Sequence, residues 1–309
     1  MARVFTFPGQ GSQAVGMGKT LSDASPAAKA VFQEVDEALG EKLSDIIWEG
    51  PLDALTLTSN TQPALMAVSL ATIAAMADAG IKVADNASYV AGHSLGEYSA
   101  LAAAGSISIS DAAKLLRIRG DAMQSAVPVG EGAMAAILGL ELEQVEGLVQ
   151  EASEAGACDV ANDNAPGQVV VSGAKQAVEK AAELAKALGA RRALMLPVSA
   201  PFHCSLMQPA AERMAEALEG ASFNAPAVPL VANVLASPIS DPDAIKKHLV
   251  EQVTGRVRWR ESIVWLSENG VTEALEVGAG KVLTGLIKRI APDVAAQAVG
   301  KPEDIQALV

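Results

Sequence analysis

The chain has 309 residues, which is more than one typical domain of about 100–200 residues. Half of the residues are hydrophobic and only 3% are aromatic, so we expect an aliphatic core and no base-stacking surface for nucleic acid. The formal net charge of −13 also disfavours nucleic acid and anionic membranes as partners.

Short β-prone runs alternate with longer helical patterns along most of the chain, which indicates an α/β fold. The expected strands are Val4–Phe7, Tyr89–Ala91, Leu230–Ala232 and Ala274–Val277, and the expected helices include Pro63–Ala79, Asp111–Ala126 and Asp243–Val253.

Residues 128–198 follow a different order. The pattern predicts strand Met134–Leu138, helix Leu142–Ala155, strands Cys158–Ala161 and Gln168–Ser172, helix Lys175–Leu188 and strand Arg192–Pro197. This βαββαβ order is that of a ferredoxin-like module, and "NDNAPGQ" between the middle strands has the residues of a tight connection. We therefore predict a core of residues 1–127 and 199–309 that carries the inserted module 128–198, with the chemistry in the cleft between them.

Two cysteines, Cys158 and Cys204, are too few for a disulfide framework and do not have the spacing of metal ligands. The N-terminus lacks the apolar region of a signal peptide. The charge-free run Ala64–Ala77 is shorter than the ~18 residues of a membrane span. We therefore expect a cytoplasmic protein with no metal and no bound cofactor.

A glycine-rich loop, "FPGQGSQAVGMGKT", follows the first expected strand. The phosphate loop of nucleotide hydrolases needs G-x-x-x-x-G-K-[ST], which here would require glycine in place of Gln13. The register of the glycines thus disfavours nucleotide binding.

The stretch "YVAGHSLGEYSALAAAG" is the most informative in the chain. Gly92-His93-Ser94-Leu95-Gly96 matches G-x-S-x-G after an apolar strand and before a helical run, which is the context of a nucleophile elbow. The glycines permit a crowded backbone, and the helix N-terminus favours developing negative charge. We predict Ser94 as a nucleophile; a serine that only caps the helix is the alternative.

A serine nucleophile needs a base, and the chain has three histidines. His93 is fixed in the elbow, so its ring is expected to point away from the serine, and His248 lies in a helical stretch. His203 follows a strand end in "LPVSAPFHC", a usual place for catalytic groups, and is the predicted base. No acidic residue between Ser94 and His203 lies in an evident strand-end loop. We therefore predict a serine–histidine dyad whose imidazole is oriented by a carbonyl or an amide. The absence of a third, acidic residue favours acyl transfer over hydrolysis, but only modestly.

An arginine interrupts the apolar face of the helix "SDAAKLLRIRGDAMQSA", which Ser110 or Asp111 is expected to cap. Arg119 falls in the apolar stripe, whereas Arg117 falls on the solvated face. A buried charge is costly unless an anion meets it. Arg119 thus either forms a structural salt bridge or snorkels, or it binds a substrate carboxylate in bidentate geometry.

Together these motifs resemble those of a known family. "FPGQGSQ", "NTQPAL", "GHSLGEYSAL", an arginine 25 positions after the serine, "SAPFH" and "EVGAGKVLTGL" are similar to the malonyl-CoA:acyl carrier protein transacylases of fatty-acid synthesis, in the same order and nearly from end to end. The resemblance implies an α/β-hydrolase-like core with an inserted ferredoxin-like domain, which agrees with the element order.

The resemblance also implies roles for the site residues. Ser94 would be acylated by malonyl-CoA, His203 would act as base and then acid, and Arg119 would hold the malonyl carboxylate. The other implied residues are Gln10 and Leu95 as backbone donors of the oxyanion hole, Gln252 as the carbonyl that orients the imidazole, and Gln62, Phe202 and Asn162 in the pocket. Among relatives, an aromatic residue directly before the histidine, here Phe202, accompanies a preference for malonyl groups. Its bulk would crowd a 2-methyl group on the acyl chain, although one methyl group contributes only about 1–3 kcal/mol to such discrimination.

The implied reaction is ping-pong acyl transfer from the coenzyme A thioester to the phosphopantetheine thiol of acyl carrier protein. We expect a monomer that docks this acidic carrier on a local basic patch. The candidate residues are Arg191, Arg192, Lys281, Lys288 and Arg289. Three alternatives stay open: a serine hydrolase or thioesterase, an acyltransferase for another acyl-CoA or for a polyketide pathway, and a nucleotide-binding module.

Overall fold

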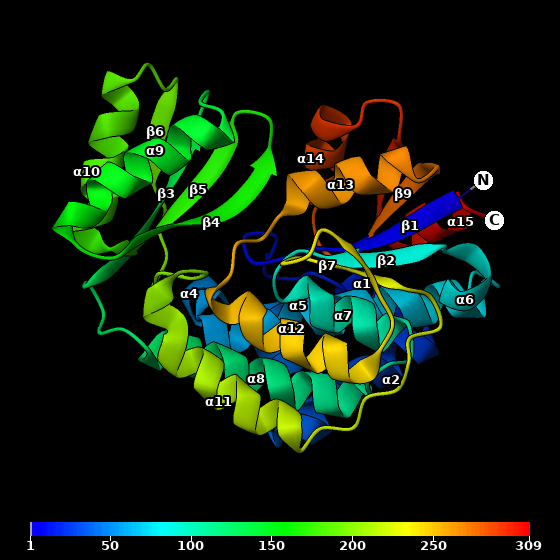
Figure 1. Cartoon of the computed structure of the whole chain (residues 1–309). Coiled ribbons are helices and arrows are strands. Elements are labelled where there is room, and N and C mark those ends of the chain that lie inside the picture. Colours follow the sequence, from blue (N-terminus) through cyan, green and yellow to red (C-terminus); the bar gives the residue numbers. More distant parts are fainter. Residues whose placement is uncertain (1) are drawn as a thin grey trace.

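Six strands form the larger of two sheets (Figure 1). The structure, a computed structural model, describes residues 2–309. The strands of this sheet are β1 (Ala2–Phe7), β2 (Tyr89–Gly92), β7 (Leu230–Ala232), β8 (Ser237–Ile239), β9 (Val271–Val277) and β10 (Ala295–Val299), in the spatial order β10-β9-β1-β2-β7-β8. Neighbours run parallel except at the β7–β8 edge, where β8 is antiparallel. The predicted parallel sheet is thus present with one antiparallel edge strand.

Helices cover both faces of this sheet (Figure 1). They are α1 (Lys19–Ala24), α2 (Pro26–Leu39), α3 (Leu43–Glu49), α4 (Leu52–Thr56), α5 (Thr58–Asp78), α6 (Val83–Asn86), α7 (Gly96–Ala103), α8 (Ile109–Ser125), α11 (Gln208–Glu219), α12 (Pro242–Thr254), α13 (Trp259–Glu268), α14 (Val282–Ile290) and α15 (Pro302–Gln306). Successive side chains of a strand point to opposite faces. Val4 therefore packs in one apolar cluster with residues of α13 and α14, whereas Phe5 and Phe7 pack in another with residues of α5 and α7.

The charge-free run Ala64–Ala77 lies inside α5, which is buried on nearly all sides, as expected for a helix that is apolar all round. Between residues 2 and 309, none of the helices is both long and apolar enough to cross a bilayer.

Four antiparallel strands form the smaller sheet, on the left of Figure 1. Its elements are β3 (Gly132–Leu138), α9 (Leu142–Ala152), β4 (Cys158–Ala165), β5 (Gln168–Ala174), α10 (Lys175–Ala187) and β6 (Arg192–Met195), and the strand order is β4-β5-β3-β6. All six elements expected between residues 128 and 198 are present in the predicted order. The apolar residues of α9 and α10 pack on the sheet in a separate cluster.

Several predicted bounds are wrong: α5 begins at Thr58 rather than Pro63, and β6 ends at Met195 rather than Pro197. The segment "NDNA" belongs to β4, and only Pro166 and Gly167 connect β4 to β5, because Asn162 and Asp163 pair with β5. The helix α9 ends at Ala152 instead of Ala155, and Ser153–Ala155 form a short 3₁₀ helix. The cap of α8 is Ser108, whose hydroxyl accepts the backbone N–H of Asp111, rather than Ser110 or Asp111.

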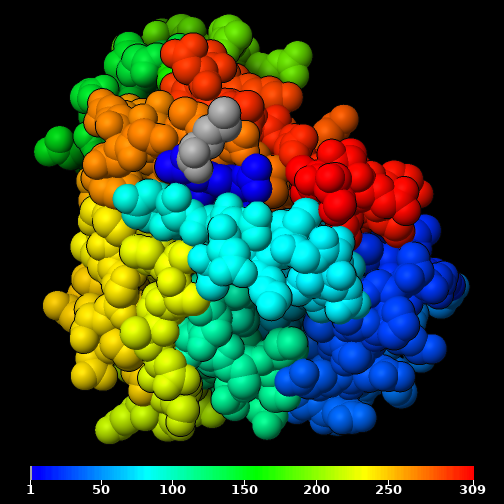
Figure 2. Space-filling model, turned by 90° about the vertical axis from the view of Figure 1, so that its right-hand side faces the viewer, coloured from blue at the N-terminus to red at the C-terminus, as the bar shows by residue number. Residues whose placement is uncertain are grey.

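Segments from opposite ends of the chain lie side by side in the larger sheet, because β1 pairs with both β9 and β2. Figure 2 shows this face: the first strand (blue) lies between the orange C-terminal segment and the cyan segment. As a result, β1 places the loop that follows Phe7 next to the loop that follows β2.

Candidate active site

Ser94 lies in a sharp turn between β2 and α7. Its φ of 54° is left-handed, a conformation that non-glycine residues rarely adopt. Small neighbours make the turn possible: a Cβ on Gly92 would lie 1.9 Å from the backbone of Gly96, and a Cβ on Gly96 would lie 2.3 Å from the carbonyl oxygen of Phe7. The strand–turn–helix geometry is that of a nucleophile elbow.

Asn233, in the loop after β7, fixes this turn. Its Oδ1 accepts the backbone N–H of Ser94 at 2.8 Å, and its Nδ2 donates to the carbonyl of Gly92 at 2.6 Å. One side chain thus holds the backbone on both sides of His93.

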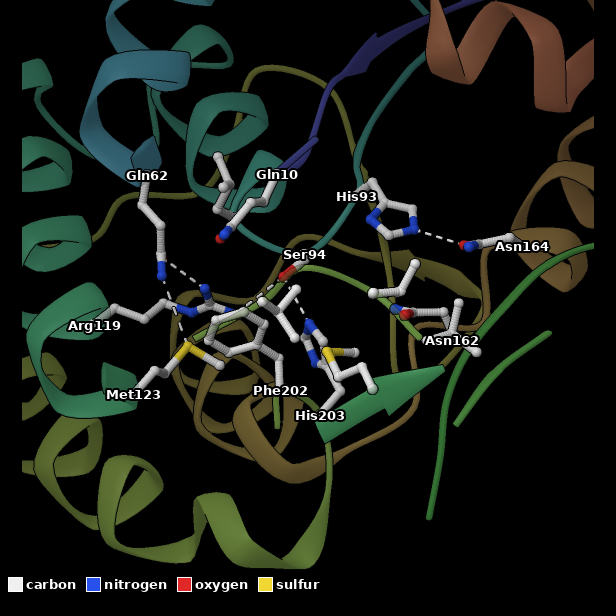
Figure 3. Close-up of a pocket in the computed structure, with 15 residues that line it drawn as sticks. Gln10, Gln62, His93, Ser94, Arg119, Met123, Asn162, Asn164, Phe202 and His203 are labelled. Carbon is white, nitrogen blue, oxygen red and sulfur yellow. Dashed lines mark hydrogen bonds between the residues drawn. The ribbon is translucent and has the colours of Figure 1, made fainter. Parts of the chain in front are cut away.

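His203 contacts Ser94 directly (Figure 3). The Nε2 of His203 lies 2.7 Å from the Oγ of Ser94, and Nδ1 lies 2.9 Å from the backbone carbonyl oxygen of Gln252. A carbonyl only accepts, so Nδ1 carries the proton and Nε2 presents its lone pair to the serine. Burial, with a smaller effect of the Arg119 charge, lowers the pKa of His203 to about 3. The ring is therefore neutral at physiological pH, as a general base must be.

Arg119 is almost completely buried, with 1% of its surface exposed. Its Nη1 donates to Gln62 Oε1 at 2.7 Å, and its Nη2 donates to Gln252 Oε1 at 2.7 Å and to Ser94 Oγ at 3.2 Å. These partners are neutral, and Nε is buried without a hydrogen-bond partner among residues 2–309. Burial lowers the pKa of Arg119, but the group stays charged. Arg119 thus forms no hydrogen-bonded salt bridge with a carboxylate in the described part of the chain, which disfavours the purely structural alternative. Its guanidinium can accept an anion.

The two expected backbone donors lie beside Ser94. Gln10 and Leu95 both line the pocket, and Leu95 is the residue before the first turn of α7, where N–H groups lack helical partners. Gly9 lets the first loop approach, since a Cβ there would lie 2.7 Å from the carbonyl oxygen of His93. The side chain of Gln10 accepts a hydrogen bond from Thr58 at 2.9 Å.

A cavity of about 180 Å³ opens at Ser94 between the two sheets. Its lining from the larger part includes Gln62, Met123 and Phe202, and Figure 3 shows their side chains around Ser94. Residues between 132 and 198 supply the opposite wall, namely Met134, Asn162, Asn164, Val170, Leu196 and Val198. The predicted pocket residues Gln62, Phe202 and Asn162 are thus brought together with the nucleophile.

The other two histidines lie away from the Ser94 hydroxyl. The Nε2 of His93 contacts Asn164 Oδ1 at 2.8 Å and points away from Ser94 Oγ, as the sequence predicts (Figure 3). His248 is partly buried on α12 and pairs with Glu251 at 2.6 Å. Lys19 of the glycine-rich loop forms an exposed ion pair with Glu49, and residues 2–309 contain no cluster of His, Cys, Asp and Glu that could hold a metal.

Sequence reasoning missed three polar residues of the site: Glu97, Asn164 and Asn233. Glu97 is 2% exposed, accepts the N–H of Asn233 at 2.6 Å and contacts the amide Nε2 of Gln252. Burial raises the pKa of Glu97, whereas the N–H of Asn233, the amide of Gln252 and the charge of Arg119 favour its ionised form. Glu97 stands three residues after Ser94 in the quoted motif, but its first-turn position was equally consistent with an ordinary helix-dipole partner.

A nucleophile elbow on a parallel sheet, with a serine–histidine pair beside a buried arginine, defines the class of serine-dependent acyl-transferring enzymes. A family model described as an acyl transferase domain matches residues 4–299. The malonyl CoA-acyl carrier protein transacylase of Bacillus subtilis (strain 168) is 48% identical over 303 residues, covering 98% of this chain and 94% of the relative. The chain belongs to the malonyl-CoA:acyl carrier protein transacylase family.

Solved structures agree with this assignment. The acyl-carrier-protein S-malonyltransferase of Bartonella henselae is 59% identical, with a TM-score of 0.98, and covers 100% of this chain and 98% of its own. A malonyl-transacylase in complex with a type II polyketide synthase acyl carrier protein is 43% identical, with a TM-score of 0.96, and covers 99% of this chain and 98% of its own.

Proposed function

We propose that the chain transfers the malonyl group from malonyl-CoA to the phosphopantetheine thiol of acyl carrier protein and so supplies fatty-acid synthesis. The observation that carries this proposal is the contact of Ser94 Oγ with both His203 Nε2 at 2.7 Å and Arg119 Nη2 at 3.2 Å. Family membership and the carrier complex of a relative support it.

In the first half-reaction Ser94 Oγ attacks the thioester carbonyl and its proton passes to His203 Nε2. The C–S bond then breaks, and His203 returns the proton to the departing sulfur of coenzyme A. In the second half-reaction the carrier thiol gives its proton to His203 and attacks the malonyl ester. The C–O bond breaks and the proton returns to Ser94. The Gln252 carbonyl keeps the imidazole in one tautomer throughout.

Negative charge develops on the carbonyl oxygen in each tetrahedral intermediate. We assign its stabilisation to the backbone N–H groups of Gln10 and Leu95, because both residues line the pocket beside the nucleophile. One such donor is typically worth about 10²–10³ in rate.

The position of Arg119 favours a short acyl group with a terminal carboxylate. Its guanidinium lies 3.2 Å from the nucleophilic oxygen, so only a few atoms fit between the reacting carbonyl and the bound carboxylate. A malonyl group, with one carbon between these groups, meets that limit. Phe202 and Met123 line the same cavity and would crowd a 2-methyl substituent, for a discrimination of about 1–3 kcal/mol.

We further propose that residues 1–127 and 199–309 form an α/β-hydrolase-like core and that residues 128–198 form an inserted ferredoxin-like domain. The elbow on a parallel sheet supports the first assignment. The βαββαβ order with strand order β4-β5-β3-β6 supports the second. A cytoplasmic location and a monomeric state stay predictions.

The carrier is expected to dock on basic residues near the β4–β5 turn. Arg289 of α14 donates to the carbonyl of Pro166 at 2.9 Å, and Arg191 lies against Gly139, whose N–H donates to the carbonyl of Gly167 at 2.8 Å. Arg191, Arg192, Lys288 and Arg289 are all exposed. We therefore assign the docking surface to Arg191, Arg192 and Arg289. We leave out Lys288, which lines a hollow with Arg3 and Glu273, and Lys281, which lies at the other end of α14.

The test is intact-mass analysis after brief exposure to malonyl-CoA. Wild type should carry one malonyl group, Ser94→Ala none, and Arg119→Ala a strongly reduced amount, while Arg117→Ala should load normally. Arg117 is a matched control because it lies two residues away and bonds Asn60 at 2.6 Å instead of the pocket. Holo-carrier should then remove the adduct.

Two results would contradict the proposal. Wild type that leaves both its own mass and malonyl-CoA unchanged would show that the elbow is inactive. Fast release of free malonate in the absence of carrier would favour the hydrolase alternative.

A further inference from the structure

Glu97 occupies the centre of a buried hydrogen-bond network behind the pocket. One carboxyl oxygen accepts the backbone N–H of Asn233 at 2.6 Å, and the other faces the side-chain Nε2 of Gln252. Glu97 is 2% exposed and does not line the cavity. Glu97 therefore makes no direct contact with a molecule in the cavity.

Gln252 connects Glu97 to all three proposed functional groups. Its backbone carbonyl accepts from His203 Nδ1, its Oε1 accepts from Arg119 Nη2 at 2.7 Å, and its Nε2 donates to the carbonyl of Ser94 at 3.0 Å. An amide can turn over, exchanging its donor and its acceptor ends. Two acceptors keep Nε2 away from the guanidinium, the carbonyl of Ser94 and the carboxyl group of Glu97.

The geometry points to Glu97 as a positioning residue for the carboxylate-binding arginine. By fixing the Gln252 amide with its oxygen toward Arg119, Glu97 holds the guanidinium where an acyl carboxylate can reach it. This inference rests on the proposed role of Arg119. It follows that the preference of Ser94 for malonyl over acetyl groups depends on a residue that touches neither the substrate nor the nucleophilic oxygen.

The decisive variant is Glu97→Gln. Whichever way the new amide is oriented, its NH₂ group faces either the Asn233 N–H or the Gln252 NH₂, both of which are donors, so one contact is lost. The matched control is Glu276→Gln. Glu276 is also buried and also accepts backbone N–H groups, those of Leu283 at 3.0 Å and Thr284 at 2.6 Å, but it lies outside the pocket lining.

The readout is the ratio of kcat/KM for malonylation to kcat/KM for acetylation of Ser94, measured by rapid quench and intact mass. We expect Glu97→Gln to lower this ratio at least tenfold and Glu276→Gln to change it less than twofold. Gln252→Met removes the side-chain amide but keeps the backbone carbonyl, and it should lower the ratio similarly. The double variant Glu97→Gln/Gln252→Met should lose no more than the worse single variant.

Ratios within twofold of wild type in folded Glu97→Gln and Glu97→Leu proteins would overturn the inference, because leucine offers Gln252 Nε2 no acceptor in any orientation. If neither protein folds, Gln252→Met decides the question by the same threshold. A fully additive double variant would also contradict the inference, because it would mean that the two residues act independently. Failure of the proposed function is a separate result: Arg119→Ala itself would then keep the wild-type ratio.

Discussion

Ser94 and His203 share an unusual backbone, with φ values of 54° and 56°. Such conformations cost about 1–3 kcal/mol each and persist when their surroundings fix them. At Ser94 the surroundings are visible: Asn233 accepts its N–H, and Gln252 and Glu97 both donate to its carbonyl, the first from its side chain and the second from its backbone. The polar network is therefore part of what keeps the nucleophile exposed.

The lowered pKa of His203 predicts an unusual pH dependence. A histidine with the ordinary pKa of about 6.5 would be largely protonated at pH 5 and inactive as a base. His203, with a pKa of about 3, stays neutral at that pH. Inactivation of Ser94 by a sulfonyl fluoride, which needs no carboxylate, should thus proceed nearly as fast at pH 5 as at pH 7. Arg119→Gln should raise the pKa of His203 and so move the acid limb of the pH profile to higher pH, by less than the return to about 6.5 because burial is the larger cause.

Circular dichroism at each pH separates this effect from acid unfolding. A wild-type profile with a midpoint near pH 6.5 would show that burial does not hold the imidazole neutral.

At the scale of residues, the sequence predicted those features that depend on a local pattern of residues. The G-x-S-x-G motif predicted a strand-to-helix turn at Ser94, and the break in the apolar stripe of α8 predicted the burial of Arg119; the structure confirms the turn and the burial. Asn233 could not be predicted in this way. It contacts Ser94 and Gly92, which lie 139 and 141 positions away in the sequence, only in the folded chain. Nothing local distinguishes it from other loop asparagines.

At the scale of elements, strands and helices were predicted better than their ends. The residues of "NDNA" favour turns by their intrinsic preferences, but in β4 they have partners that the local sequence does not reveal. The backbone at Asn162 forms a β-bridge with Val257, the side chain of Asp163 pairs with Arg260, and the side chain of Asn164 contacts His93. Tertiary contacts thus extended the strand beyond its propensity.

These contacts predict unequal effects of two arginines that link the same parts of the chain. Arg260 pairs with Asp163, whose side chain is 1% exposed, whereas Arg256 pairs with Glu146, whose side chain is 45% exposed. Burial raises the pKa of Asp163 and Arg260 opposes this effect, so losing Arg260 leaves a buried acid without its partner. Arg260→Ala should cost about 1–3 kcal/mol, less than a fully buried pair because Arg260 is partly exposed.

Arg256→Ala should cost less than about 1 kcal/mol, as exposed pairs do. The free energy of unfolding in urea measures both. Equal losses in the two variants would show that the burial of Asp163 does not set the strength of its pair.

At the scale of the whole molecule, a net charge of −13 opposes the approach of an acidic carrier. On the proposed assignment, docking then depends on the basic residues around the β4–β5 turn. Arg192→Glu should raise the KM of the malonylated enzyme for holo-carrier about tenfold with little change in kcat, because rim charges act mainly on association. The control is Arg213→Glu on α11, where Arg213 pairs with Glu216 in an exposed position.

The difference between these two variants should shrink at high salt, where exposed charges are screened. Equal KM values for Arg192→Glu and Arg213→Glu at low salt would place the docking surface elsewhere.

The cavity walls come from two parts of the chain. The groups assigned to the reaction and to binding of the acyl carboxylate, Gln10, Ser94, Leu95, Arg119 and His203, lie before residue 128 or after residue 198, whereas Met134, Val170 and Leu196 are among the residues that face them from the other side. Substitutions at Met134, Val170 or Leu196 therefore change the shape of one cavity wall and leave all of these groups in place. During evolution, part of the cavity shape can thus vary by mutation while the groups assigned to catalysis are kept, whereas changes at Met123 or Phe202 lie in the same part of the chain as those groups.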